Sequence, residues 1–213
     1  AAGEIARQAR PGQFVHVRCG DSYDPLLRRP ISLHRINPAT GEICLLYRVV
    51  GRGTKRLSTV KAGETLDVLG PLGNGFNLDT TAVSQESVLL GGGIGAAPLL
   101  ALAEELVRLD RSVTAVLGAA SSADLLAVDA FRSLGIKVIV STDDGSEGCR
   151  GTVVDAFMEW LRHQGQDTGI TAFACGPHPM IKALQRLSMK GNINLQVALE
   201  ERMGCGLGGC LSC

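Results

Sequence analysis

Short apolar segments alternate with amphipathic ones in the second half of this chain, and that alternation limits the possible folds more than any other feature. The apolar segments are SVLL, VTAVLG, KVIVS and TAFAC, and the amphipathic ones are PLLALAEELVRL, ADLLAVDAFRSL, TVVDAFMEWLRHQ and PMIKALQRLSMK. Strands that alternate with helices form βαβ units, in which a parallel sheet is covered on both faces. We therefore predict an α/β domain over residues 84–195.

The residues before this domain follow a different pattern. The β-rich runs FVHVR, ISLHRI, EICLLYRVV and ETLDVLG are separated by Pro-Gly, Asn-Pro and Gly-x-Gly turns, and the first residues lead directly into FVHVR. Short strands with such turns are typical of an antiparallel barrel or sandwich. We predict an all-β domain over residues 1–83 with a short helix in TKRLSTV, and a third segment over residues 196–213 that begins within the strand-like run INLQVALEE.

Charge and hydropathy argue against several functions. The 21 basic residues balance 21 acidic ones, so no net field draws the chain to nucleic acid or to an anionic membrane surface. No apolar run approaches the roughly 18 residues that span a bilayer, and the opening residues lack the apolar core of a signal peptide. We expect a soluble, cytoplasmic protein.

The end of the chain holds the most specific motif. Cys205, Cys210 and Cys213 have the spacing C-x4-C-x2-C and stand among glycines. Plant-type [2Fe-2S] loops have this spacing, and glycine lets the backbone turn its amides toward the sulfurs. A zinc knuckle and unliganded thiols are the alternatives. We expect the fourth thiolate of a cluster to lie beyond the last residue of the chain.

Two segments of the all-β domain could clamp the diphosphate of a dinucleotide. Arg29 opens the segment RPIS, and Gly53 and Thr54 lie further along in GRGT. A guanidinium offers a forked donor to phosphates, and the amides of Gly53 and Thr54 add donors where a helix begins. The alternative is a solvated basic turn at RRPIS and a plain hairpin at GRGT.

A glycine-rich turn stands between the first strand and the first helix of the α/β domain. It contains Gly91, Gly92, Gly93 and Gly95. Glycines here permit a tight turn and the close approach of a pyrophosphate, although they could merely pack the helix on the sheet. Cys175 ends a later strand at the same sheet edge, where it lies near a nicotinamide or fills a corner of the core.

Selection between NADH and NADPH should depend on the segment GAASSADLL, which follows the second strand. This segment holds no arginine to pair with a 2′-phosphate, which favours NADH. Asp143 and Asp144 favour the same choice, although an ordinary acidic turn explains them equally well. The four histidines show no hydrolase spacing, so a hydrolase triad has no support, and we predict no catalytic side chain for electron transfer.

The ordered set of motifs resembles a known family. RRPIS, LYRVVGRGT, LGPLGNGF, GGGIGAAPL, ACGP and ERMGCGLGGCLSC occur in this order over nearly the whole chain. The set is similar to the electron-transfer subunits of NAD-dependent dihydroorotate dehydrogenase, which themselves resemble ferredoxin-NADP reductases. This resemblance implies an N-terminal flavin-binding β-barrel, a Rossmann-like NAD domain and a [2Fe-2S] segment that is cut short.

The resemblance also implies roles for individual residues. The FAD would be lined by Arg29, Pro30, Ile31 and Ser32 and flanked on the next strand by Leu46, Tyr47 and Arg48, with Gly53 and Thr54 at its diphosphate. The nicotinamide side would be formed by Gly91, Gly92, Gly93, Gly95 and Cys175. Three of the four cluster ligands would be Cys205, Cys210 and Cys213.

The implied function is electron transfer in pyrimidine biosynthesis. NADH gives its two electrons together and an iron-sulfur cluster accepts one at a time, so FAD is expected between them. The implied partner is an FMN-containing catalytic dihydroorotate dehydrogenase subunit, in a heterotetramer with two copies of each chain. The same layout also occurs in electron-bifurcating NADH/ferredoxin complexes, sulfide dehydrogenases and hydrogenases. A non-catalytic redox or zinc sensor is the alternative from another functional class.

Overall fold

The computed structural model describes residues 2–20, 23–79, 86–164, 169–191 and 193–211. The chain divides into two compact units, Ala1–Gly75 with Glu200–Cys213, and Phe76–Leu199. The predicted boundary between residues 83 and 84 lies outside the described residues. The predicted third segment, residues 196–213, groups with the first unit from Glu200 onward. Which domain binds which cofactor stays a prediction.

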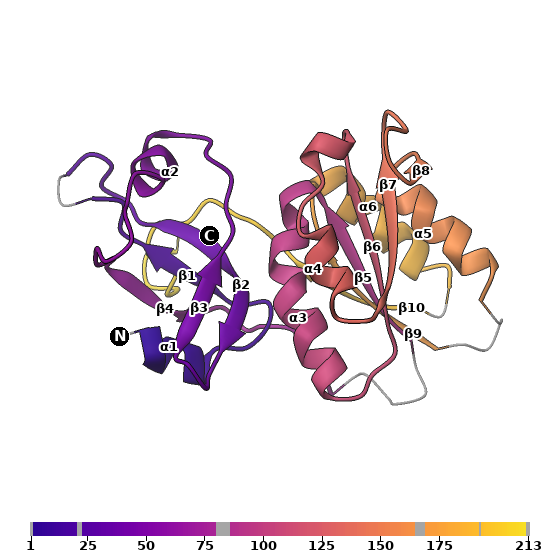
Figure 1. Ribbon diagram of the computed structural model, residues 1–213, viewed down its shortest axis with the longest axis horizontal. Coiled ribbons are helices and arrows are strands. Elements are labelled where there is room, and N and C mark those ends of the chain that lie inside the picture. Colours follow the sequence, from indigo (N-terminus) through magenta and orange to yellow (C-terminus); the bar gives the residue numbers. More distant parts are fainter. Residues whose placement is uncertain (1, 21–22, 80–85, 165–168, 192, 212–213) are drawn as a thin grey trace. The chain divides into compact units, whose positions relative to one another are not determined.

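The first unit is built on an antiparallel sheet of four strands in the order β3-β2-β1-β4 (Figure 1). The strands are β1 (Phe14–Val17), β2 (Arg29–Asn37), β3 (Glu42–Leu45) and β4 (Val68–Leu72), and the helix α2 spans Arg52–Leu57. Apolar residues alternate along the paired strands, so that one face of the sheet supplies the buried core residues Val15, Val17, Ile31 and Leu33.

Two local predictions for the first unit need correction. The helix α1 (Ala2–Gln8) precedes β1, where no element was expected, and it buries Ile5 and Ala6. The strand predicted over EICLLYRVV is shorter, because the ladder between β2 and β3 ends at the pair Leu33 and Leu45. Leu46, Tyr47 and Arg48 therefore follow the strand and do not belong to it.

The second unit contains a parallel sheet in the order β10-β9-β5-β6-β7-β8. Its strands are β5 (Glu86–Gly92), β6 (Val113–Ala119), β7 (Lys137–Thr142), β8 (Cys149–Arg150), β9 (Ile170–Cys175) and β10 (Ile193–Ala198). The predicted fold class, an antiparallel β domain joined to a Rossmann-like parallel-sheet domain, is confirmed.

Helices cover both faces of the parallel sheet, as predicted (Figure 1). One core cluster joins the sheet to α3 (Ala96–Arg108) and α4 (Val128–Arg132). The other joins it to α5 (Val153–Arg162) and α6 (His178–Ser188). Within the described residues, no helix combines the length and apolar character needed to cross a membrane.

The single helix predicted over ADLLAVDAFRSL is wrong. A short 3-10 turn, η2 (Ser122–Asp124), is followed by extended backbone at Leu125 and by Ala127 with a φ of +59°. A left-handed residue cannot continue the hydrogen bonding of a helix. The helix therefore begins only at Val128.

Candidate functional site

The strand order of the second unit places a switch point between β5 and β9. From β5 the chain proceeds through β6 and β7 on one side, and it then crosses to β9 on the other side. Ligands of open α/β sheets bind at such points, outside the carboxyl ends of the strands. In the ladder, Gly91 of β5 lies opposite Cys175 of β9. Two of the predicted nucleotide motifs therefore meet at this edge.

The glycine turn packs directly against the end of β9. A Cβ built on Gly95 would lie 2.1 Å from the carbonyl oxygen of Cys175 and 2.7 Å from the nitrogen of Gly176. Gly93 has a φ of +56°, which favours glycine, and it has open space where a side chain would project. The turn therefore presents bare backbone at the switch point, as a pyrophosphate requires.

Gly92 lies against the start of α6, a contact that the sequence did not predict. A Cβ on Gly92 would be 2.7 Å from the sulfur of Met180 and 3.0 Å from Cδ of Pro177. Met180 also lies next to Gly176, with its sulfur 2.8 Å from a Cβ built there. Nothing in the spacing of Met180 distinguishes it from a core residue of a helix.

The two predicted halves of the diphosphate clamp lie together in the first unit. A Cβ on Gly53 would be 2.6 Å from Nε of Arg29 and 2.9 Å from its Nη2. The guanidinium is held from the other side, because its Nη1 donates to the carbonyl oxygen of Leu27 at 2.5 Å. Only glycine lets the arginine approach the backbone this closely. The arrangement is a cradle that suits a diphosphate.

Thr54 shapes the loop beside this cradle. Its hydroxyl accepts hydrogen bonds from the amides of Val50 at 3.0 Å and Gly51 at 3.1 Å. Thr54 is 8% exposed, so these bonds form in a largely dry setting. The hydroxyl of Thr54 thus stabilises the loop and occupies the amides of Val50 and Gly51.

The cysteine loop has the chemistry of an iron-sulfur site. The amides of Leu207 and Cys210 donate to Sγ of Cys205 at 3.3 and 3.4 Å, and the amide of Cys205 donates to Sγ of Cys210 at 3.4 Å. The hydrogen bonds from the Leu207 and Cys210 amides lower the pKa of Cys205 to about 6. A thiolate is the form that binds iron, so the two cysteines fit a cluster.

The third predicted ligand, Cys213, lies outside the described residues. Across residues 2–211, gaps excepted, no group of three His, Cys, Asp or Glu side chains is placed to hold a metal ion. The prediction of a cluster therefore rests on the spacing and on the hydrogen bonds to Cys205 and Cys210.

Comparison with known proteins assigns the family. Residues 89–186 match the model of the oxidoreductase NAD-binding domain. The electron transfer subunit of dihydroorotate dehydrogenase B (NAD(+)) from Desulforamulus reducens is 45% identical over 215 residues, covering 100% of this chain and 79% of that protein. The corresponding protein of Shouchella clausii is 44% identical over 99% of this chain and 79% of its own length. This chain belongs to the family of dihydroorotate dehydrogenase B electron transfer subunits.

A solved structure shares the fold of the whole chain. The NADH-dependent reduced ferredoxin-NADP oxidoreductase, an enzyme of flavin-based electron bifurcation, superimposes with a TM-score of 0.83 at 32% identity, covering 99% of this chain and 73% of that one. The predicted family and the predicted enzyme class, an NAD-linked oxidoreductase subunit, are confirmed.

The remaining predicted flavin residues of this family member differ in their exposure. Pro30 is exposed and Ser32 is half-buried, whereas Ile31 is 6% exposed and packs into the core of the unit. Tyr47 packs partly against the same core, and Arg48 is exposed. The side chain of Ile31 therefore serves the core and offers little surface to a ligand.

The loops that follow β6 and β7 are tied together at the carboxyl edge of the sheet. The amide of Ser122 donates to the hydroxyl of Ser146 at 2.8 Å, and that hydroxyl donates to Asp144 at 2.6 Å. Hydrogen bonds from Ser146 hold the pKa of Asp144 below its usual range. A carboxylate at this edge would repel the 2′-phosphate of NADPH, which fits the predicted preference for NADH.

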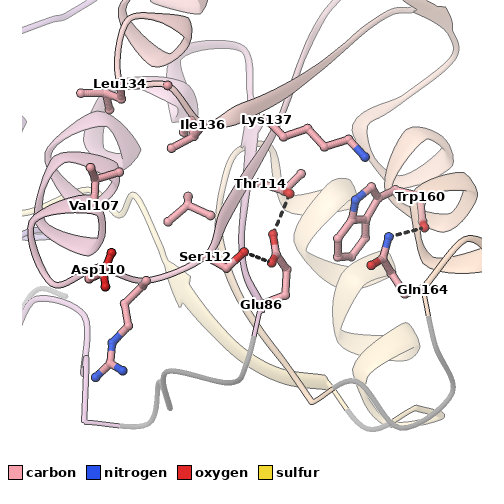
Figure 2. Close-up of a pocket in the computed structure, with 13 residues that line it drawn as sticks. Glu86, Val107, Asp110, Ser112, Thr114, Leu134, Ile136, Lys137, Trp160 and Gln164 are labelled. Atoms are coloured by element: carbon pink, nitrogen blue, oxygen red, sulfur yellow. Dashed lines mark hydrogen bonds between the residues drawn. The ribbon is translucent and has the colours of Figure 1, made fainter.

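A hollow of about 530 Å³ lies at the opposite edge of the same sheet. Figure 2 shows the Glu86 carboxylate there, between the hydroxyls of Ser112 and Thr114, which both donate to it. These residues lie at the amino ends of their strands or just before them. Open α/β sheets bind their ligands at the other edge, so the switch point, and not this hollow, is the candidate nucleotide site.

Proposed function

We propose that this chain carries electrons between NAD(H) and a catalytic subunit that oxidises dihydroorotate, by means of FAD and a [2Fe-2S] cluster. The observation that carries the proposal is the packing of the Arg29 guanidinium on Gly53. This contact brings together Arg29 and Gly53, the two predicted halves of the diphosphate clamp. The chain is also 45% identical to an electron transfer subunit. The product orotate is used in pyrimidine biosynthesis, where we place the activity.

The chain's own residues bind and orient the cofactors. Bound FAD exchanges two electrons at once with a nicotinamide and one at a time with an iron-sulfur cluster. Arg29 and the backbone at Gly53 would hold its diphosphate, and the bare backbone at Gly93 and Gly95 would receive the nicotinamide nucleotide. Cys205, Cys210 and Cys213 would hold the iron. No side chain needs to act as an acid, a base or a nucleophile.

The direction of electron flow follows from the electron acceptor that the related subunits name, and the reaction balances in that direction. Oxidation of dihydroorotate to orotate releases two electrons and two protons, and reduction of NAD⁺ takes up two electrons and one proton. The related subunits carry NAD(+) in their names. Electrons therefore flow from the catalytic subunit to NAD⁺. The sequence-based expectation, in which NADH gives the electrons, describes the same path in reverse.

Co-expression of the full-length subunit with its catalytic partner tests this function. We expect the complex to show flavin absorbance and bound iron, to reduce NAD⁺ with dihydroorotate, and to have the mass of two copies of each chain by light scattering. Arg29→Ala should lose most of the FAD, whereas Arg7→Ala, which removes an exposed arginine of α1, should keep it. A colourless complex that contains zinc and no iron would contradict the proposal.

A second candidate keeps the cofactors but changes the partner. The solved structure with a TM-score of 0.83 belongs to an electron-bifurcating enzyme, so this chain could serve as the reductase subunit of such a complex. Co-purification distinguishes the two candidates. Recovery of a dihydroorotate-oxidising subunit supports the first, and recovery of a partner that reduces ferredoxin supports the second.

A further inference from the structure

His16 is buried on the face of its sheet that turns away from the core. It lies in β1 directly opposite Pro30 of β2, so the two side chains project to the same face. Val15 and Val17 project to the other face and join the core. A residue on the outer face of an antiparallel sheet is commonly exposed, and Pro30 is exposed. His16, however, is only 1% exposed, so another part of the unit must cover it.

The cysteine loop forms part of that cover. A Cβ built on Gly206 would lie 2.8 Å from Nε2 of His16 and 3.0 Å from its Cε1. Gly206 follows Cys205 directly and has a φ of +68°. The imidazole therefore packs on the loop backbone between two predicted cluster ligands, and its strand partner Pro30 belongs to the predicted flavin segment.

His16 faces the loop with a neutral ring, and the Nε2 atom of this ring has no hydrogen-bond partner among the described residues. Burial, and secondarily the positive charge of Arg28, lower the pKa of His16. Its Nε2 is buried and finds no hydrogen-bond partner in the described part of the chain. Buried polar atoms in folded proteins are nearly always paired. Because the unpaired Nε2 lies beside a loop suited to iron and sulfur, we infer that its hydrogen-bond partner is a group that this loop binds.

We propose that His16 is a positioning residue, which holds the cysteine loop against β1 through Gly206 and directs Nε2 toward the sulfur atoms that the loop carries. This inference rests on the proposed function, because it places His16 between the two cofactors. Groups that contact the ligands of a metal without binding the metal orient those ligands and tune the electronic properties of the site. His16 would act in this way without binding iron itself.

The test uses the full-length subunit in complex with its partner. The variants are His16→Ala, His16→Gln and His16→Leu, with His163→Ala as the control, because the His163 side chain is 73% exposed at the end of α5. For each we would measure FAD and iron content, the EPR spectrum of the reduced cluster, and the rates of flavin and cluster reduction after mixing with NADH.

We expect His16→Ala to keep its FAD and its rate of flavin reduction, but to reduce its cluster about 10- to 100-fold more slowly, with an altered EPR spectrum. Glutamine can place an amide nitrogen near the position of Nε2, so His16→Gln should restore much of the rate and spectrum. A wild-type spectrum and rate in His16→Ala would overturn the inference. So would equal rescue by leucine, because the ring would then only fill space.

Two glycines of the loop provide a test that keeps His16 intact. Gly206→Ala places a methyl group against Nε2, whereas Gly208→Ala places one in open space; both residues have a positive φ, +68° and +79°. Backbone strain is therefore matched, and only the contact with His16 differs. We expect a larger change in the EPR spectrum for Gly206→Ala, and equal spectra would overturn the inference.

Failure of the proposed function would look different. In that case the wild-type complex itself would lack flavin or iron, and both proposals would fall together. If the wild-type complex holds both cofactors and the His16 and Gly206 variants match it, only the inference about His16 falls.

Discussion

The backbone of Gly95 lies against the carbonyl group of Cys175, so closely that a Cβ on Gly95 would be 2.1 Å from the oxygen and 2.4 Å from the carbon. Gly95 has a φ of −63°, which any residue adopts. Glycine is therefore required here by the approach of two backbone segments and not by its own conformation. The contact holds the glycine turn after β5 against the end of β9, on the two sides of the switch point.

Gly95→Ala should separate these two segments and weaken binding of the nicotinamide nucleotide. The added methyl group meets backbone atoms, which cannot rotate away, so we expect a loss of stability at the upper end of the roughly 1–3 kcal/mol typical of overpacking. Urea unfolding and NADH titration measure the two effects. Gly191→Ala is the control, because its Cβ would meet atoms no closer than 3.7 Å. Unchanged NADH affinity in Gly95→Ala would argue against a site at this edge.

Gly53→Ala should release bound FAD from the first unit. Its methyl group would lie 2.6 Å from Nε of Arg29 and push the guanidinium out of the cradle. Gly51→Ala is the matched control in the same loop, because nothing lies within 4 Å of a Cβ at that position. The ratio of flavin absorbance to protein absorbance after gel filtration compares the two variants. Equal flavin retention would show that the cradle does not hold the diphosphate.

The parallel sheet could be predicted from the sequence because its strands are buried on both faces. Such strands appear as continuous apolar runs, as in ITAFAC, all of which is buried in β9. The helix α1 gave no such signal, since a helix of 7 residues that buries only Ile5 and Ala6 is too short to show periodicity. The break before α4 depends on a left-handed alanine, Ala127, which no residue preference indicates.

The sequence predicted the motifs of the candidate site one by one, but it did not predict which of their residues contact each other. Arg29 and Gly53 are distant in sequence, and only the folding of the sheet and the loops brings the guanidinium onto the glycine. His16 gave no functional signal, because a histidine within a strand is ordinary. Its importance appears only from its burial on the outer face and its contact with Gly206.

Ser122→Arg should shift nucleotide preference toward NADPH. Ser122 is exposed in the loop after β6, at the edge assigned to the nucleotide, and its loop holds no arginine. A hydrogen bond to a charged group contributes about 1.5–3 kcal/mol, which corresponds to a rise of roughly tenfold or more in the ratio of kcat/KM for NADPH to that for NADH. Ser133→Arg adds the same charge at an exposed position after α4 and should leave the ratio unchanged.

Thr152→Ala should destabilise the second unit in a manner that depends on pH. Thr152 caps α5, because its hydroxyl accepts from the amide of Asp155 at 3.2 Å and donates to the Asp155 carboxylate at 2.7 Å. Loss of such a cap costs about 1 kcal/mol. The hydrogen bonds from Thr152 lower the pKa of Asp155 below its usual value of 3.8.

A carboxyl group whose pKa is lowered by folding stabilises the native state above its unfolded pKa, and this contribution disappears as the pH falls through the folded pKa. We therefore expect the full difference in the free energy of unfolding between wild type and Thr152→Ala at pH 7, and a smaller difference below about pH 3.8. Urea unfolding across this range measures it, with Ser133→Ala as an exposed control. A difference that stays constant with pH would show that the Asp155 carboxylate does not take part in the cap.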